Sequence, residues 1–394
     1  MAGLPPPAPL TRDRALLLSA RGLRAFGFGF SAVLVALHLE RAGMSPTLIG
    51  ATLAVGLAAA SLTGLASAAL AGRFGRRRTL AGVGLLMALT GIDLALARQP
   101  GLLVLSGLTG MLGAASVDYG PFASVEQAVV AETAGPKTRN RAFGRYSLTG
   151  GLFNAAGGLS TVVLSDSRTF FLLYAAIGVI TALLPLVMSS QVEGEPAQPV
   201  FGSFRPLAGL AALFALDSLG GGFVANAVIA YWLHARFGAG PGLLGPVFAG
   251  VAILQSFSYE VSGRLADRVG LINTMVFTHL PSNLLLLLVP FSPNLAWAVA
   301  LLLARFALSQ MDVPARQAYI VSIVPAGERA GAVAMTGAVR GVAMSFGPAL
   351  AGIAIGAAAF GLPFLAGGGL KIAYDLALFA GFRNSPADHE KRIS

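Results

Sequence analysis

The chain has 394 residues, of which 55% are hydrophobic and only 11% are charged. Its mean hydropathy is +0.75, whereas soluble domains carry roughly 25% charged residues. These values exclude a water-soluble fold and a disordered chain, and the absence of cysteine excludes disulfide frameworks, thiolate metal sites and cysteine nucleophiles. The net charge of +10 does not indicate nucleic acid as a partner, because no solvated basic face with interleaved aromatic residues is present.

The chain begins with a Pro-rich, charged segment, MAGLPPPAPLTRDR, in which we expect no removable signal peptide. Apolar blocks long enough to span a bilayer follow, since a spanning helix needs about 20 mostly apolar residues. The blocks cover 15–39, 46–70, 79–98, 101–125, 143–164, 168–189, 207–234, 241–262, 271–291, 294–318, 332–356 and 361–382. The blocks lack the alternation of a membrane barrel. The sequence therefore predicts an all-α membrane protein with twelve transmembrane helices.

Basic residues are distributed unequally between the predicted connections. If the N-terminus is cytoplasmic, the outer connections contain only Arg41, Arg98, Arg168 and Arg236. The inner segments contain sixteen: Arg12, Arg14, Arg73, Arg76, Arg77, Arg78, Lys137, Arg139, Arg141, Arg205, Arg264, Arg268, Arg329, Arg383, Lys391 and Arg392. This positive-inside bias predicts a multi-pass protein of the cytoplasmic (inner) membrane, in contact with the lipid bilayer and with both termini in the cytoplasm.

The two halves of the chain are related by an internal repeat. At an offset of 195 residues, Arg41 matches Arg236, Pro46 matches Pro241, and Arg145 matches Arg340. We expect an N-terminal six-helix half over 1–189, a cytoplasmic linker over 190–205, and a C-terminal six-helix half over 206–394. Parallel halves around a central cavity are typical of transporters that work by alternating access.

The connection after the second block carries a motif, and the repeat contains a second copy of it. The first copy reads AALAGRFGRR over 68–77, and the second reads GRLADRVG over 263–270. With the repeat, these segments resemble the G-x-x-x-D-R-x-G-R-R signature of the major facilitator superfamily. The resemblance implies two pseudo-symmetric six-helix bundles and a cytoplasmic gate formed by Arg73, Gly75, Arg76, Asp267, Arg268 and Gly270. Gly72 replaces the usual Asp in the first copy, so we expect an asymmetric latch that relies on Asp267.

Ionisable residues inside the apolar blocks are expensive in a membrane and are candidates for function. The family pattern implies a cavity lined by the first, fourth, seventh and tenth helices. In those helices the candidates for the substrate and proton cavity are Arg24, Asp118, Asp217, Arg305 and Asp312. Carboxylates in such a cavity are able to carry protons, with Asp217 and Asp118 as first candidates. Glu126 and Arg316 better fit salt bridges that hold the helices together.

Other charges inside the blocks are interpreted as structural. Lys371 and Asp375 have the i, i+4 spacing of an intrahelical pair, and Arg340 is a candidate partner for Asp312. His279 has no suitably spaced partner, so we assign it no metal role.

The function predicted from these features is secondary active transport of a small molecule by a monomer. The preferred form is proton-coupled export of drug-like or metabolite compounds, with the proton gradient as energy source and no cofactor. Two departures weaken that assignment: Ser106 lies where drug antiporters of the family carry Arg, and the run FNAAGG over 153–158 lacks their Gly-Pro. Transport of a small anion is the alternative, because Arg21, Arg24 and Arg305 lie near the expected cavity. A channel or a non-transporting receptor is a remote alternative, and no enzyme motif is present.

Overall fold

The computed structural model describes residues 8–114, 120–133, 139–163, 166–193, 205–325 and 329–383. All regular structure in these ranges is helical. In the first half the α-helices are α1 (Ala8–Arg41), α2 (Pro46–Phe74), α3 (Arg76–Leu96), α4 (Pro100–Leu108), α5 (Pro121–Thr133), α6 (Arg139–Ser160) and α7 (Ser167–Leu183). The second half contains α8 (Arg205–Phe223), α9 (Asn226–Phe237), α10 (Pro241–Val269), α11 (Leu271–Leu288), α12 (Leu295–Leu308), α13 (Asp312–Ser322), α14 (Arg329–Gly356) and α15 (Leu362–Phe382). Short 3-10 helices cover Leu184–Val187, Ser190–Val192 and Val289–Phe291.

These helices form twelve transmembrane segments, as predicted. Ten candidate spans meet length and hydropathy criteria within the described residues. The fourth segment, α4 with α5, and the fifth, α6, complete the set. Residues 194–204, most of the predicted linker, lie outside the described residues.

Three segments that the sequence predicted as continuous blocks are broken helices. The block 101–125 is interrupted after Leu108, where Gly110 and Gly113 adopt positive φ angles of 73° and 65°. The block 207–234 is divided into α8 and α9 by an extended Ala225, and the block 294–318 into α12 and α13 at residues 309–311. Apolar patterning does not reveal these breaks, because the residues on both sides of each break remain apolar.

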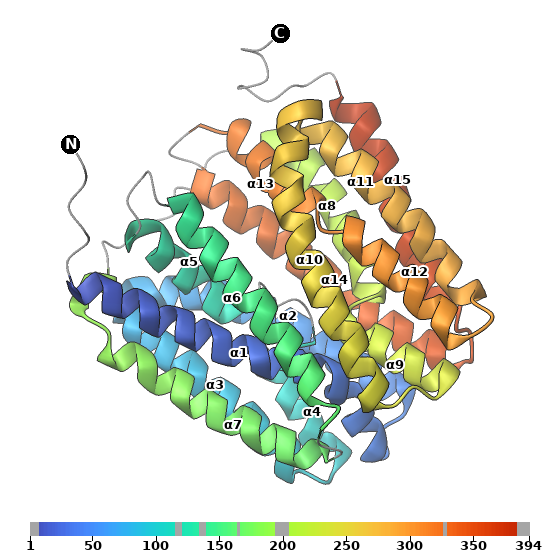
Figure 1. The fold of residues 1–394 in the computed structure, drawn as a ribbon, viewed down its shortest axis with the longest axis horizontal. Coiled ribbons are helices and arrows are strands. Elements are labelled where there is room, and N and C mark those ends of the chain that lie inside the picture. Colours follow the sequence, from blue (N-terminus) through green and yellow to red (C-terminus); the bar gives the residue numbers. More distant parts are fainter. Residues whose placement is uncertain are drawn as a thin grey trace.

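The halves are built alike and lie side by side, with α1–α7 in the blue-to-green part of Figure 1 and α8–α15 in the green-to-red part. The repeat is visible in local geometry at the motif loops. Gly75 has φ 89° and ψ 154°, and Gly270 has φ 87° and ψ 163°. Only glycine adopts such angles without strain.

The hydrophobic cores show that the halves are joined at one end. We call the end where α1 begins and α15 ends the terminal end, and the other the distal end (Figure 1). At the distal end one buried cluster contains residues of both halves, including Leu34, Leu53, Trp232 and Ile355. Toward the terminal end each half has its own cluster, around Val129 and Tyr146 in the first and around Phe214 and Tyr319 in the second. The halves therefore pack together distally and have separate cores terminally.

Close backbone contacts seal the distal end. A Cβ added at Gly50 of α2 would lie 2.4 Å from the Pro348 oxygen and 2.7 Å from Gly352 Cα in α14. On another side of the interface, Thr161 Oγ1 donates a hydrogen bond of 3.1 Å to the Pro241 carbonyl. Glu40 of α1 forms an ion pair of 3.0 Å with His234 of α9. This packing depends on small residues, as is common between membrane helices.

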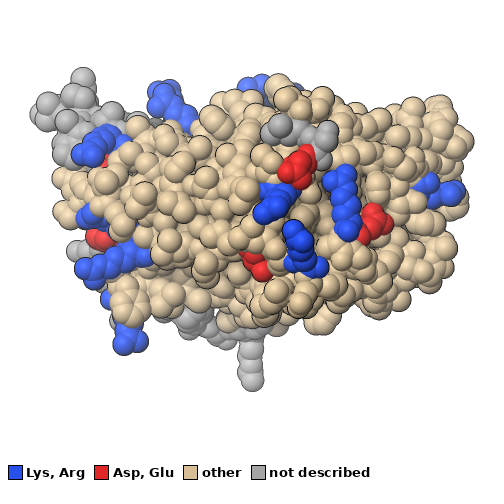
Figure 2. Space-filling view, turned by 90° about the horizontal axis from the view of Figure 1, so that it is seen from below, with Lys and Arg blue, Asp and Glu red and all other residues tan. Residues whose placement is uncertain are grey.

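The outer surface agrees with a lipid environment. Figure 2 shows a face that is largely without charged residues, with charges gathered at its left margin and in a group right of the centre. Large apolar side chains such as Leu85, Leu89 and Leu183 are more than half exposed. Such a broad apolar surface is suited to acyl chains rather than water.

Candidate functional site

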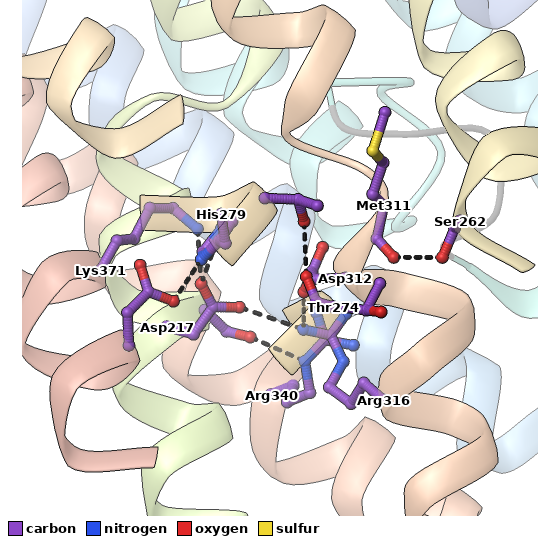
Figure 3. A network of polar contacts seen from close by, with 12 residues as sticks. Asp217, Ser262, Thr274, His279, Met311, Asp312, Arg316, Arg340 and Lys371 are labelled. Atoms are coloured by element: carbon purple, nitrogen blue, oxygen red, sulfur yellow. Dashed lines mark hydrogen bonds and ion pairs between the residues drawn. The ribbon is translucent and has the colours of Figure 1, made fainter. Parts of the chain in front are cut away.

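The largest group of buried charges lies inside the second half and centres on Asp217 of α8 (Figure 3). Lys371 Nζ of α15 donates to Asp217 Oδ1 at 2.6 Å, and Arg316 Nη1 of α13 donates to Asp217 Oδ2 at 3.3 Å. Asp217 is 4% exposed, so its charge is compensated by cations from two other helices rather than by water. Buried charges are stable only when they are paired in this way.

A histidine extends this group toward a second carboxylate. His279 of α11 lies between the two acids, with Nδ1 2.8 Å from Asp375 Oδ1 and Nε2 3.7 Å from Asp217 Oδ1. Asn283 Nδ2, one turn along the same helix, is 2.8 Å from Asp375 Oδ2. His279 and Asp375 are both buried. The group therefore connects α8, α11 and α15 through hydrogen bonds and ion pairs between buried side chains.

The predicted intrahelical pair of Lys371 and Asp375 is wrong. Both residues are buried on α15, but Lys371 binds Asp217 on α8 and Asp375 binds His279 on α11. The i, i+4 spacing places the two side chains on one face of α15. That face packs between α8 and α11, and each of these helices supplies a partner for one of the two side chains. An exposed helix would have favoured the local pair, whereas burial makes interhelical partners available.

Two arginines complete the group on the side of the tenth and eleventh segments. Arg316 Nη1 also donates to Asp312 Oδ2 at 2.7 Å, one turn earlier on α13. Arg340 Nε of α14 donates to the Ser218 hydroxyl at 3.0 Å, beside Asp217. The cation paired with Asp312 is thus Arg316, where the sequence suggested Arg340.

Arg305 on α12 is exceptional among the predicted cavity residues. It is 5% exposed, and within the described part of the chain its Nε and Nη1 have no hydrogen-bond partner. Its guanidinium carbon lies 4.6 Å from the centroid of the adjacent Phe306 ring. A buried guanidinium with unused N–H groups is costly, so this position favours an additional anionic or polar partner.

The first half contains a smaller group of buried charges. Arg24 of α1 pairs with Glu126 of α5, which also accepts a hydrogen bond of 2.8 Å from Tyr146. The guanidinium of Arg24 stacks on Phe122 at 3.9 Å. The expected structural role of Glu126 agrees with this geometry, and it engages Arg24, which the sequence placed in the cavity. Asp118 lies outside the described residues.

The hydrogen bonds and ion pairs that the structure gives for the two motif loops at the terminal end join residues of the same half. Arg76 binds Glu132 through two hydrogen bonds of 2.6 Å, and its backbone N–H is capped by Glu193. Glu193 thus supplies a carboxylate near the loop whose motif has Gly72 in place of Asp. Arg73 is exposed, and Asp267 and Arg268 are exposed and form no ion pair within the described part of the chain. Within the described residues no ion pair therefore joins Asp267 to the first motif loop, and the latch stays a prediction.

Sequence reasoning missed His279, Asn283, Glu132, Glu193 and the interhelical pair of Glu40 and His234. The two carboxylates that His279 contacts lie far away in sequence, on α8 and α15. A buried histidine among apolar residues of a span was the available signal.

Known proteins match this chain over almost its entire length. The model of the Major Facilitator Superfamily matches residues 17–215 and 210–394. The chain is 24% identical to an uncharacterised membrane protein of Saccharomyces cerevisiae, over 98% of this chain and 97% of that protein. The fold is similar to that of the nucleoside transporter NupG, with a TM-score of 0.73, 16% identity, and coverage of 94% of this chain and 99% of that one. A D-xylose-proton symporter gives a TM-score of 0.70 with 15% identity, over 93% and 97% of the two chains.

Proposed function

Because the chain belongs to the major facilitator superfamily, we propose that it is a proton-coupled secondary transporter that exports a small drug-like or metabolite compound. Transport follows alternating access, in which the two halves rock about a central site. The proton gradient supplies the energy, and no bound cofactor is required. The protein acts as a monomer in the cytoplasmic membrane.

The observation that carries this proposal is the group of buried charges around Asp217. Three carboxylates, Asp217, Asp312 and Asp375, lie buried within membrane-spanning helices. Asp217 is paired with cations of two other helices, whereas Asp312 is paired within α13 and Asp375 contacts the imidazole of α11. A fold that needed only stability would be served equally well by apolar residues, because buried ion pairs contribute little net stability. Carboxylates buried among ionisable groups of several membrane helices are suited to bind and release protons.

Asp217 is the proposed proton-binding carboxylate of the transport cycle. It lies on α8, the terminal-end part of a broken helix, whereas α9, the distal part, packs against α1. A proton on Asp217 would remove the charge that attracts Lys371 and Arg316. Without that attraction α8 is able to change its position relative to α13 and α15, which links proton binding to movement of a cavity-lining helix.

With both termini in the cytoplasm, the terminal end faces the cytoplasm and the distal end faces outward. The joined distal core and the separate terminal cores then correspond to an inward-facing conformation. The unengaged Asp267 fits this assignment, because the family's latch acts when the cytoplasmic side is closed.

Transport of a small anion is the second candidate, and Arg305 is the observation that favours it. Among the described residues of the apolar blocks, the buried basic residues number five and the acidic residues four: Arg21, Arg24, Arg305, Arg316 and Lys371 against Glu126, Asp217, Asp312 and Asp375. Arg305 has two N–H groups in position to bind a carboxylate or phosphate. An anionic substrate would supply the partner that the guanidinium lacks.

A ligand screen followed by a flux assay tests both candidates. Thermal shifts of the purified protein across drug-like cations, amino acids and organic or inorganic anions identify compounds that bind. Compounds that bind are then added to proteoliposomes containing a pH-sensitive dye. Stabilisation by hydrophobic or cationic compounds together with proton movement supports the main proposal. Stabilisation by anions that is lost in Arg305→Gln supports the second, and flux without proton movement contradicts coupling.

A further inference from the structure

We infer that His279 is a proton-binding residue that controls the position of α8, through a competition with Lys371 for Asp217. This inference rests on the proposed proton coupling and deepens it, because it names a proton acceptor to which sequence reasoning gave no role. The residue lies on α11, outside the helices expected to line the cavity, so the control acts from within the second half.

The geometry defines which nitrogen is available to a proton. The contact of 2.8 Å between His279 Nδ1 and Asp375 Oδ1 requires a hydrogen between the two atoms, since two lone pairs at that distance repel. With the hydrogen on Nδ1, Asn283 Nδ2, 3.1 Å from Nδ1, donates to Asp375 instead. Nε2 of the neutral ring then carries a lone pair that faces Asp217 Oδ1 at 3.7 Å. At this distance the two atoms form no hydrogen bond.

Binding of one proton to Nε2 would convert this gap into a charge-assisted hydrogen bond. The imidazolium would then donate from Nδ1 to Asp375 and from Nε2 to Asp217, with a carboxylate on each side. Asp217 Oδ1 is the same oxygen that accepts from Lys371 Nζ at 2.6 Å. The imidazolium and the ammonium would then share one oxygen atom, and the repulsion between these two cations would weaken the contact of Lys371.

The surrounding charges make this competition effective. His279 contacts Asp217 on α8 and Tyr374 and Asp375 on α15, and around Asp217 lie Lys371 on α15, Arg316 and Asp312 on α13, Arg340 on α14 and Arg305 on α12. These groups include three carboxylates and four permanent cations, so they carry one net positive charge while His279 is neutral. A proton on His279 leaves the group with an additional positive charge, and like charges in a buried site weaken one another's binding.

The movable element in this arrangement is α8. Its contact with α15 is close because glycines line it: a Cβ on Gly220 would lie 2.7 Å from the Gly367 oxygen and 3.0 Å from Lys371 Cγ. Lys371 ties α8 to α15 at the same place (Figure 3). The chain between α8 and α9 is unwound at Val224 and Ala225, which provides a hinge. A proton on His279 would weaken the contact of α8 with α15 and strengthen its contact with α11. The preferred angle between α8 and α9 would change as a result.

Distance measurements between spin labels test this inference without a known substrate. The chain contains no cysteine, so single cysteines introduce labels at chosen positions without removing native ones. Phe74→Cys and Val269→Cys are equivalent positions of the repeat at the terminal end, and both side chains are exposed. The full-length double-labelled protein in nanodiscs is measured by pulsed dipolar spectroscopy across pH 5–8, the range in which histidine titrates.

We expect the label-to-label distance distribution to shift with pH. This shift should be lost in His279→Gln and should remain in His38→Gln. His38 is the matched control, because its Nδ1 contacts the Ser167 hydroxyl at 2.8 Å rather than a carboxylate. In Asp375→Asn the shift should be smaller, because the imidazolium loses a charged acceptor; this variant serves where His279→Gln does not fold. A distribution that is independent of pH, or a shift that persists in His279→Gln, overturns the inference.

A parallel proton-flux measurement separates this inference from the proposed function. If wild-type proteoliposomes show solute-dependent proton movement and His279→Gln retains both that movement and the pH-dependent shift, His279 is not the acceptor although coupling stands. If wild type moves no proton with any solute, the proposed coupling fails independently of the distance data.

Discussion

The distal seal between the halves gives a sharp prediction at Gly50. In Gly50→Ala the new methyl group would lie 2.4 Å from the Pro348 oxygen and 2.7 Å from Gly352 Cα, where real contacts below 3.0 Å are essentially never found. Both opposing atoms belong to backbone, so no side chain is able to turn away. Overpacking of this kind costs about 1–3 kcal/mol, and α2 and α14 must separate to relieve it. The population ratio should therefore change about 5–150-fold in favour of the conformation in which the distal end is open.

The label pair at Phe74 and Val269 measures this change from the opposite end. Opening of the distal end accompanies closing of the terminal end in alternating access, so Gly50→Ala should increase the population with a short distance between the labels. Gly82→Ala is the matched control, because Gly82 also lies within a helix but a Cβ there meets nothing within 4 Å. Equal distance distributions in Gly50→Ala, Gly82→Ala and the parent would refute the reasoning that close packing here holds the distal end shut.

Three further perturbations follow from individual contacts. Glu126→Gln should lower the free energy of unfolding by about 3–5 kcal/mol, because Arg24 loses its buried counter-charge. Glu132 is half-exposed, so Glu132→Gln should cost at most about 1 kcal/mol. Thermal unfolding in detergent compares the two variants, and equal effects would contradict a structural role for the buried pair of Arg24 and Glu126. Glu40→Gln removes a half-exposed pair with His234 and should change the label distance populations less than Gly50→Ala does. The Thr169 hydroxyl and the Arg168 amide lower the pKa of the exposed Asp166 below its usual 3.8. Its capping of α7 therefore stabilises the fold above that pH, and this contribution is lost as the pH falls further. Asp166→Ala should lower the free energy of unfolding at pH 7 by about 1 kcal/mol, and an unchanged melting temperature would argue against the cap.

The sequence was sufficient for the architecture because bilayer thickness and the cost of unpaired backbone groups limit the possible folds. The match of Arg73 and Gly75 with Arg268 and Gly270 located two equivalent loops, and the structure has the same positive-φ glycine in each. The breaks within the fourth, seventh and tenth segments were not predictable from hydropathy, since an unwound segment inside protein remains apolar.

Individual charges were predicted better than their partners. Asp217, Asp312, Arg316 and Lys371 were recognised as unusual because charge is scarce in the spans, and all four lie in one buried group. The pairing of Lys371 with Asp217 joins residues that are 154 positions apart, so it depends on helix packing that no local spacing encodes. For the same reason the two carboxylates that His279 contacts could not be identified from the sequence.

The central claim is that movement of a solute is linked to proton movement through Asp217. The most direct measurement is the proton flux that a stabilising solute causes in proteoliposomes containing a pH-sensitive dye, compared between wild type and Asp217→Asn at equal protein incorporation. The account predicts a solute-dependent proton flux in wild type that is absent in Asp217→Asn. A flux of wild-type size in Asp217→Asn, or solute movement without any proton flux in wild type, would contradict it.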